Sequence, residues 1–495
     1  MDSPQPERPT HVSVAMDTHS PRHLAETICG TCHRFPEPGL LDSNTWVRHA
    51  LPHMEPWLGL APPDRERDRG GAYVLPDDAY TQTPLLSSEQ WQTIRDFYAT
   101  HAPPQQPPQQ SRPPIQSPFT QFRIREFAYF RPTPMTAMVK IDPDRKRLLV
   151  GDALTRTLES RFADGRHEFT VEFDSVPISV RLRPAGMDLT TVGRLFPSDL
   201  TRGTVLQLQS GNEGVQITKV LGDLRRPTHV AYADLNGDGR EDLAVCQFGH
   251  RLGRFSWFEE SGNAMWKEHV LIDRPGAIRS VVQDLNGDDQ PDMMVVMGQA
   301  WEGVHLFLNE GGGEFGERIV VQQHPLFGFS WMEMADFNED GHPDLLTSNG
   351  DNGDNISPFK GYHGVRIYLN DGRNQFEESY FFPLNGAYKA LPADFDNDGD
   401  MDIAAISWFP DYRTSESFVY LENQGDGRFT PWSFPECNAG RWLTMDAGDL
   451  DGDGDEDIVL GSFVQGPTTI PIPEAISNRW TTRPQAILVL ENTQR

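Results

Sequence analysis

The chain has 495 residues and a formal net charge of −29 at pH 7. This length predicts more than one domain. The negative charge excludes nucleic acid as an expected partner, because a phosphate backbone would be repelled. No run of about 18 apolar residues occurs, so we expect no membrane-spanning helix.

A small helical domain is predicted over residues 21–101, after a disordered stretch at residues 1–20. Residues 23–31 can form one helix, and a second begins at the capping pair Ser87 and Gln90. One face of the second helix is apolar, which is typical of a helix packed on a core. This face consists of Trp91, Ile94, Phe97 and Tyr98.

The segment Cys29-Gly30-Thr31-Cys32-His33 matches C-x-x-C-H, the attachment motif of c-type haem. Two thiols at this spacing can bond the haem vinyl groups, and the histidine that follows can ligate the iron. A thioredoxin-like dithiol would need a surrounding βαβ pattern, and zinc would need a second ligand pair. We expect the remaining cysteines, Cys246 and Cys437, to be buried free thiols, too far apart for a disulfide. The motif therefore predicts covalent haem at Cys29, Cys32 and His33.

With a haem motif on its first helix and an aromatic helix at its end, residues 21–101 resemble a small class I cytochrome c. The resemblance implies an all-α fold and a sixth iron ligand. Met54 is the candidate, because it is the only methionine between the motif and the final helix. Methionine would give a low-spin centre suited to electron transfer. His49 and His53 stay open as ligands, since the 21-residue interval from His33 to Met54 is short for that family, and Met54 could instead be a core thioether.

Residues 102–119 form a linker rich in proline and glutamine, with seven prolines between residues 102 and 118. Such a segment should run as polyproline II, a semi-rigid spacer of at most ~50 Å. We therefore expect the helical domain to be tethered to the rest of the chain.

Residues 120–495 carry an acidic nine-residue pattern, D-x-[DN]-x-D-[GD]-x-x-D, in five copies. The copies begin at residues 234, 284, 336, 394 and 449, which are 50 to 58 residues apart. Each is followed by a short apolar run, as in Leu243-Ala244-Val245, which predicts a loop between two strands. The period predicts a β-propeller, in which one unit cannot bury its own faces.

A second repeated element, a strand followed by a turn, occurs in the same units, for example at Leu306–Gly311 and Ile367–Gly372. Residues 138–150 look like a further unit whose acidic loop has decayed. Dividing residues 120–495 by the period gives seven units, a common number of blades. The last unit stops one strand short, so we expect a strand near Gln121–Tyr129 to close the ring.

These loops and strand-turn elements resemble FG-GAP and VCBS repeats, which occur in integrin α-chain propellers and in secreted bacterial proteins. Residues 349–354, 360–364 and 406–411 are similar to VCBS-repeat proteins of environmental bacteria. The resemblance covers roughly residues 120–495. The expected fold is thus mainly β, a seven-bladed β-propeller with a small all-α, cytochrome c-like N-terminal domain.

The acidic loops predict up to five Ca²⁺ sites, because oxygen ligands at positions 1, 3, 5 and 9 with Gly at position 6 suit this ion. A solvated turn is the alternative for any one copy, but five similar copies favour calcium. Asp289 replaces the glycine of the second loop, so we expect that site to be the weakest. With position 7 included, the predicted site residues are Asp234, Asn236, Asp238, Arg240 and Asp242; Asp284, Asn286, Asp288, Gln290 and Asp292; Asp336, Asn338, Asp340, His342 and Asp344; Asp394, Asp396, Asp398, Asp400 and Asp402; and Asp449, Asp451, Asp453, Asp455 and Asp457.

Haem attachment and calcium loops both favour a periplasmic or extracellular location, because cytosolic Ca²⁺ is scarce. The first residues, however, show neither the basic region nor the apolar core of a secretion signal. We favour a misplaced start or a removed signal over an error in the haem interpretation.

Three functions stay open. The first is an electron-transfer haem protein whose propeller docks a redox partner, a protein or a polysaccharide. The second is a purely adhesive or carbohydrate- or protein-binding propeller. The third is a haem-coupled dehydrogenase or a polysaccharide-active enzyme, although no nucleophile triad or zinc motif occurs. Candidate pocket residues for an enzyme are His250, Asp351, Asp354, Tyr362 and His363. Clusters of this composition are more often turns or further cation sites.

Overall fold

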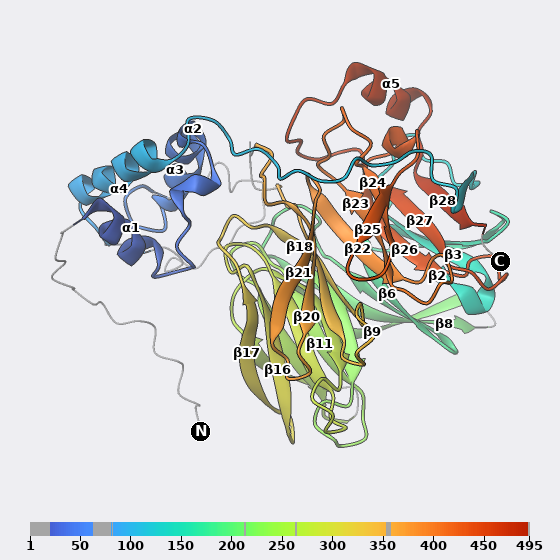
Figure 1. Cartoon of the computed structure of the whole chain (residues 1–495). Coiled ribbons are helices and arrows are strands. Elements are labelled where there is room, and N and C mark those ends of the chain that lie inside the picture. The colour runs from blue at the N-terminus through green and yellow to red at the C-terminus, as the bar shows by residue number, and fades with distance from the viewer. Residues whose placement is uncertain are drawn as a thin grey trace. The chain divides into compact units, whose positions relative to one another are not determined.

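The computed structural model describes residues 20–62, 81, 83–211, 214–262, 265–352 and 358–493, which form two compact units (Figure 1). The first unit contains the described residues up to Gln105, and the second begins at Gln106. The predicted disordered stretch lies outside the described residues, except for Ser20. Within the described ranges, no helix is long and apolar enough to cross a membrane.

The described part of the first unit contains helices and no strand. Ser20 begins α1 by accepting a hydrogen bond from the His23 amide at 3.1 Å. The capping box of Ser87 and Gln90 confirms the predicted start of α4, and the predicted apolar face of α4 is buried. The elements are α1 (Pro21–Cys29), η1 (Pro38–Leu40), α2 (Ser43–Thr45), η2 (Trp46–Ala50), α3 (Leu51–Met54) and α4 (Ser88–His101).

Aromatic side chains form the core of this unit. The Trp46 and Tyr98 rings lie 4.4 Å apart between centroids. Each places its polar atom on a backbone carbonyl, with Trp46 Nε1 donating to Pro38 at 2.8 Å and the Tyr98 hydroxyl to Pro36 at 2.7 Å. These bonds satisfy the buried donors and join the loop after α1 to α4.

The second unit is a seven-bladed β-propeller, as predicted, built from seven antiparallel four-stranded sheets. Blade 1 contains β2 (Thr136–Asp142), β3 (Arg147–Asp152), β4 (Thr157–Phe162) and β5 (His167–Glu172), with η4 (Pro143–Arg145) in its first turn. Blade 2 contains β6 (Pro177–Arg183), β7 (Gly186–Thr191), β8 (Thr201–Gly211) and β9 (Gly214–Arg225). Blade 3 contains β10 (Pro227–Ala233), β11 (Asp242–Gln247), β12 (Arg254–Glu260) and β13 (Trp266–Ile272). Blade 4 contains β14 (Ala277–Gln283), β15 (Asp292–Met297), β16 (Gly303–Gly311) and β17 (Glu314–Gln322). Blade 5 contains β18 (Phe329–Ala335), β19 (Asp344–Asn349), β20 (Gly364–Asn370) and β21 (Phe376–Pro383). Blade 6 contains β22 (Ala387–Ala393), β23 (Asp402–Ser407), β24 (Phe418–Asn423) and β25 (Phe429–Trp432). Blade 7 contains β26 (Trp442–Gly448), β27 (Asp457–Ser462), β28 (Ile487–Asn492) and β1 (Phe122–Arg125), and the chain adds η5 (Cys437–Ala439) and α5 (Glu474–Thr482).

The ring closes through β1, which confirms the predicted closing strand. β1 pairs with β28, with Phe122 opposite Asn492, and Gln121 Nε2 donates to Asn492 Oδ1 at 2.8 Å. The first strands of the blades contact one another in a closed circle, in the order β2, β6, β10, β14, β18, β22 and β26. They therefore surround the propeller axis.

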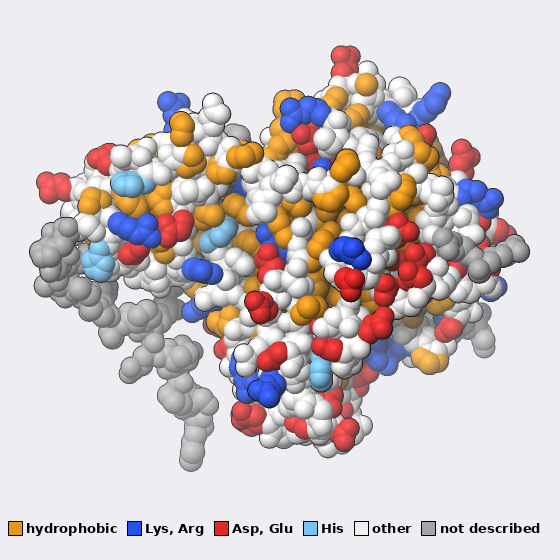
Figure 2. Space-filling view, in the orientation of Figure 1, with side chains coloured by type: hydrophobic (Ala, Val, Ile, Leu, Met, Phe, Trp, Pro, Cys, Tyr) orange, Lys and Arg blue, Asp and Glu red, His pale blue; other side chains and the backbone are white. Residues whose placement is uncertain are grey.

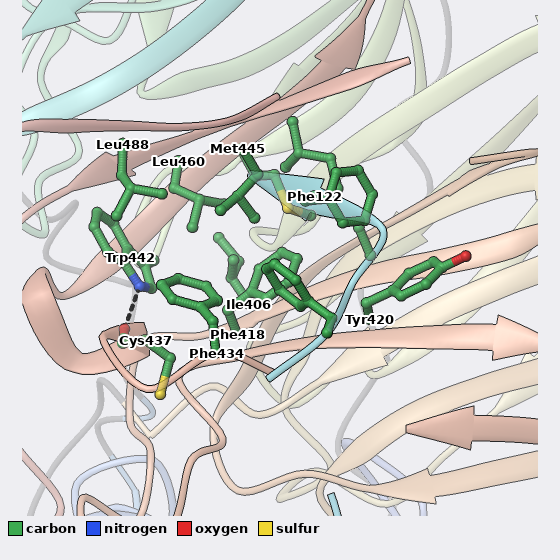
Figure 3. Close-up of a cluster of buried hydrophobic side chains, with 14 of the residues drawn as sticks. Phe122, Ile406, Phe418, Tyr420, Phe434, Cys437, Trp442, Met445, Leu460 and Leu488 are labelled. Carbon is green, nitrogen blue, oxygen red and sulfur yellow. Dashed lines mark hydrogen bonds between the residues drawn. The ribbon is translucent and has the colours of Figure 1, made fainter. Parts of the chain in front are cut away.

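A buried cluster joins blades 6 and 7 to the closing strand (Figure 3). Phe122 of β1 packs against Phe395 and Tyr420. Trp442 donates a hydrogen bond to the Cys437 carbonyl at 2.7 Å. Burying these side chains holds β1, the first strand of the propeller in the chain, against its last two blades. Cys437 and Cys246 are both buried and free, as predicted.

The first strand of every blade shifts its pairing register near its start. The shifts lie between Thr136 and Met138, Pro177 and Ser179, Pro227 and His229, Ala277 and Arg279, Phe329 and Trp331, Ala387 and Lys389, and Trp442 and Thr444. A bulge of this kind re-aims side chains locally. Repetition in seven blades places equivalent residues around the axis.

The segment from Gln106 to Pro118 lies along the propeller surface. Arg112 forms an ion pair with Glu416 at 2.7 Å and donates to the Pro383 carbonyl at 2.6 Å, and Gln116 exchanges backbone hydrogen bonds with blade 6. The sequence predicted a semi-rigid linker over residues 102–119. From Gln106 onward this linker packs on the blades, because Arg112 and the backbone donors find partners there.

Candidate metal and haem sites

Each acidic loop connects the first and second strands of a blade, in blades 3 to 7. The aspartate at position 1 organises the loop. In the first loop Asp234 accepts hydrogen bonds from the amides of Gly237, Asp238 and Gly239 at 2.8 to 3.1 Å. Asp394 accepts equivalent bonds in the fourth loop. The backbone is thus wound around the carboxylate, which brings positions 3 and 5 toward it.

The aspartate at position 9 is fully buried in all five loops. Asp402 accepts hydrogen bonds from the Phe395 amide at 3.1 Å, the Asn423 amide at 2.7 Å and the Tyr420 hydroxyl at 2.7 Å. It therefore fastens the loop to the third strand of its blade. The nine-residue pattern predicted this position only as a ligand. Its structural role depends on the third strand of the blade, which lies outside the pattern.

Three carboxylates converge in each of the last two loops. In the fourth loop an oxygen from each of Asp394, Asp396 and Asp398 lies within 4.8 Å of the others, and Asp449, Asp451 and Asp453 do the same in the fifth. In the first three loops position 3 is asparagine. Figure 2 shows groups of Asp and Glu side chains on the visible face of the protein.

The crowding of negative charge perturbs the pKa values of these loops. Burial and the neighbouring Asp398 raise the pKa of Asp396 to about 6, and burial together with Asp453 raises the pKa of Asp455 to about 6. Burial is also the main reason that the pKa values of Asp402 and Asp457 rise to about 7. A divalent cation would reverse these shifts, because it favours the ionised carboxylates.

The fifth loop has a further property of a cation site. The Oδ1 atoms of Asp451 and Asp455 are buried and accept no hydrogen bond from any described residue. Unpaired buried carboxylate oxygens are costly. A hard cation would satisfy both, so the residues present fit a Ca²⁺ ion.

The first loop differs at position 7. The Arg240 guanidinium forms an ion pair with Asp238 and another with Glu260 at 2.9 Å. The second and third loops have Gln290 and His342 at position 7. Their described contacts with the position-5 carboxylate are hydrogen bonds from the Gln290 side-chain amide and the His342 backbone amide, not ion pairs. Arg240 therefore competes with a cation for Asp238.

Positions 4 and 6 of the loops both adopt left-handed backbone. Asp289 takes φ 64° at position 6, where Gly239 of the first loop takes φ 83°. Glu339 and Asn397 take φ 59° at position 4, a requirement that sequence analysis missed. The glycines at position 4 of the other three loops were the signal for it. The second, third and fourth loops each carry one non-glycine residue in this region.

The haem motif lies at the end of α1. Gly30 ends the helix, and a Cβ atom at this position would come within 2.6 Å of the Glu26 carbonyl oxygen. Cys32 is exposed, whereas the Cys29 thiol lies beside Tyr98 and burial raises its pKa to about 11. Neither thiol is in a disulfide, and the two face different surroundings.

His33 has the form that ligates metals. Its Nδ1 lies 3.0 Å from the Arg34 carbonyl oxygen. Since a carbonyl can only accept, Nδ1 carries the proton and Nε2 keeps its lone pair. Burial lowers the pKa of His33, which favours the neutral ring. A backbone carbonyl on the second nitrogen is the usual support of a ligating histidine, so the motif fits a haem iron.

The candidates for the sixth ligand share one region. Met54 ends α3, His53 precedes it, and His49 lies in η2 just before α3. Met54 is half-buried.

The described residues suggested for an enzyme pocket belong to two blades. Asp351, Tyr362 and His363 lie between β19 and β20 of blade 5, where His363 is fully buried and the Tyr362 hydroxyl donates to the Leu326 carbonyl at 3.1 Å. His250 lies after β11 of blade 3. Asp354 is outside the described residues.

Part of the propeller matches a known family model. Residues 284–347 and 406–460 match the family model described as FG-GAP-like repeat, so the chain carries repeats of this kind. Among solved structures, BBS1N in complex with ARL6DN matches with 11% identity and a TM-score of 0.45, over 76% of this chain and 97% of that one. The N-terminal domain of Nup159 matches with 9% identity and a TM-score of 0.43, over 78% and 99%. A putative 6-phosphogluconolactonase from Bacteroides fragilis matches with 12% identity and a TM-score of 0.40, over 60% and 82%. No curated protein matches the chain.

Proposed function

We propose that this protein is an exported electron-transfer protein, with a covalent c-type haem on the helical unit and a calcium-stabilised propeller that docks a partner. The observation that carries the haem assignment is the C-x-x-C-H motif whose His33 keeps Nε2 free. Cys29 and Cys32 would hold the group, and Met54 is the proposed sixth ligand. Bound haem would supply one-electron redox chemistry.

The acidic loops of the propeller support calcium binding and export. Five loops share one ligand pattern, and in the fifth the buried Oδ1 atoms of Asp451 and Asp455 have no described donor. Ions in these loops would offset part of the −29 net charge. Multiple sites of modest affinity fill most readily outside the cytosol, which supports a periplasmic or extracellular location. The docked partner would be a redox protein or a polysaccharide.

A pyridine haemochrome spectrum after export-competent expression with the haem maturation machinery tests the proposal. The wild type should retain a red chromophore after denaturation, and the double change Cys29→Ala with Cys32→Ala should lose it. Cys246→Ala is the matched control, because it removes a buried thiol from a blade. A colourless wild type would refute the haem assignment.

The same preparation tests the axial ligand and the role. Met54→Ala should convert a low-spin spectrum to a high-spin one, whereas an unchanged spectrum would move the ligand to His49 or His53. Reversible reduction without substrate turnover is expected of an electron carrier. Reduction that depends on a sugar or alcohol donor would instead show a haem-coupled dehydrogenase.

A further inference from the structure

A cavity of about 350 Å³ is lined by the first strands of blades 1, 2 and 3 and by the second strand of blade 2. Its volume is in the range of small-molecule sites. Blade 3 contributes the Tyr232 side chain and the apolar Val230 and Ala231 to its wall. A small solute therefore has room between blades 2 and 3.

Blade 2 presents a polar face to this cavity. Ser179 pairs with Thr190, and Arg181 pairs with Asp188, in the ladder of β6 and β7. Since directly paired residues point to the same side of a sheet, these four side chains share one face. All four line the cavity. The alternate residues of these strands, such as Leu189, pack instead in an apolar cluster with blade 1.

Asp188 departs from the pattern of the repeat. In each blade, one residue of the second strand pairs with the residue that lies two positions after the bulge of the first strand. In six blades this residue is apolar and fully buried, namely Leu149, Ala244, Met294, Leu346, Ala404 and Val459. In blade 2 it is Asp188, which is 2% exposed. A carboxylate thus occupies a position that belongs to the core in the other blades.

Two polar atoms on this face have no partner. Asp188 Oδ1 and Arg181 Nη1 are both buried, and neither forms a hydrogen bond with any described residue. Buried polar atoms without partners are costly. One of them is an acceptor and the other is a donor. A ligand that both donates and accepts hydrogen bonds would satisfy the two together.

The charges around the cavity balance one another. Among the described residues, three cations form ion pairs with three carboxylates. The pairs are Lys140 with Asp446 at 3.0 Å, Arg181 with Glu241 at 2.7 Å, and Arg183 with Asp188 and, at 2.6 Å, with Glu241. A ligand with a net charge would therefore meet no uncompensated opposite charge here.

His229, which also lines the cavity, adds no charge to it. Arg279 Nη1 lies 3.1 Å from His229 Nε2, and since arginine can only donate, Nε2 carries no proton. Burial, Arg279 and Lys389 lower the pKa of His229 well below its usual value. Arg279 and Lys389 lie on neighbouring first strands, 4.6 and 4.1 Å from the centre of the Trp331 ring. The imidazole is therefore a neutral part of the cavity wall.

We propose that this cavity binds a small neutral polyol, such as a monosaccharide. One ligand hydroxyl would donate to Asp188 Oδ1, and another would accept from Arg181 Nη1. The hydroxyls of Ser179, Thr190 and Tyr232 add further polar groups to the wall. The proposal needs neither the haem nor calcium, so its failure would leave the proposed function untouched.

Ligand-observed NMR titration of the calcium-saturated full chain at pH 7 tests the proposal. D-glucose, D-galactose and myo-inositol are the probes, and glycine, a zwitterion, and succinate, a dianion, are the charged references. At least one polyol should bind with a Kd of about 10 mM or lower, and more tightly than either reference. No binding by any of the polyols, or tighter binding of glycine or succinate, would overturn the proposal.

Variants locate the site. Asp188→Ala should weaken polyol binding at least tenfold, and it should fold, because Ala244 occupies this position in blade 3. The matched control is Asp164→Ala, since Asp164 is 65% exposed in a turn of blade 1 and should leave Kd unchanged. If Asp188→Ala does not fold, Arg181→Leu tests the donor in its place, because blade 6 has Leu391 at that position. Equal Kd in the site variant and in Asp164→Ala would overturn the assignment.

Discussion

Single residues set how strongly each acidic loop should hold calcium. Position 5 faces the centre of the converging carboxylates in the fourth and fifth loops. Asp398→Ala and Asp453→Ala should therefore each remove one bound ion, measured by metal analysis after dialysis. Asp288→Ala in the second loop should change the total least, because Asp289 holds a left-handed backbone at position 6 and position 3 is Asn286. The fourth loop also has a left-handed non-glycine residue, Asn397, but three carboxylates converge there. A second loop that binds as tightly as the fourth would contradict this ranking.

Arg240 gives a second prediction at this scale. Its guanidinium forms an ion pair with Asp238, a predicted calcium ligand. A calcium ion that binds Asp238 must therefore displace the guanidinium. Arg240→Gln should raise the calcium affinity of the first loop several-fold, because the competing charge is gone and the second loop already has Gln290 at this position. Calorimetry would measure the change. Unaltered affinity would show that Arg240 moves aside without cost.

At the scale of elements, the docked segment before β1 can be tested through one ion pair. Arg112 is 15% exposed and its partner Glu416 is fully buried. Arg112→Ala should lower the free energy of unfolding by about 1–3 kcal/mol, because a buried carboxylate loses a charged donor. The control is Arg123→Ala, since Arg123 is 68% exposed in its pair with Glu491 and should cost less than about 1 kcal/mol. Urea unfolding measures both, and equal effects would mean that the segment adds no stability.

The sequence predicted those elements whose signals are local or periodic. The loop period revealed the blades, the missing last strand revealed β1, and Ser87 with Gln90 revealed the start of α4. The bulge before His229 was invisible, because a register shift depends on the pairing of two strands. The docking of Arg112 was missed for the same reason, since Glu416 lies 304 residues away in sequence.

The candidate sites also divide into those with local sequence signals and those formed by residues distant in sequence. The motif around Cys29 and the acidic loops could be found because their ligands lie within nine residues of one another. The contacts among His229, Arg279, Trp331 and Lys389 could not be found, since successive members are 50, 52 and 58 residues apart in sequence and meet only when the ring closes.

At the scale of the whole molecule, calcium should contribute much of the stability of the propeller. An ion that binds only the folded state adds about 2.7 kcal/mol per site at a hundredfold excess over Kd. Removal of calcium by a chelator should therefore lower the melting temperature by several degrees, measured by calorimetry. Magnesium is the control ion, because it prefers tighter octahedral sites and should restore less. An unchanged melting curve after addition of the chelator would show that the loops are turns that bind no stabilising ion.

Calcium should also reverse how stability depends on pH. Without metal, the folded-state pKa values of Asp402 and Asp457 are raised to about 7, and those of Asp396 and Asp455 to about 6. The folded chain then binds more protons than the unfolded chain, so the stability from these groups is complete below about pH 4 and is lost as pH rises toward 7. Bound calcium depresses the same pKa values, so the loaded protein should instead lose stability as pH falls. Between pH 5 and 8 the melting temperature should fall as pH rises after calcium removal, whereas that of the loaded protein should stay level and fall only below about pH 4. Parallel curves would contradict carboxylate ligation.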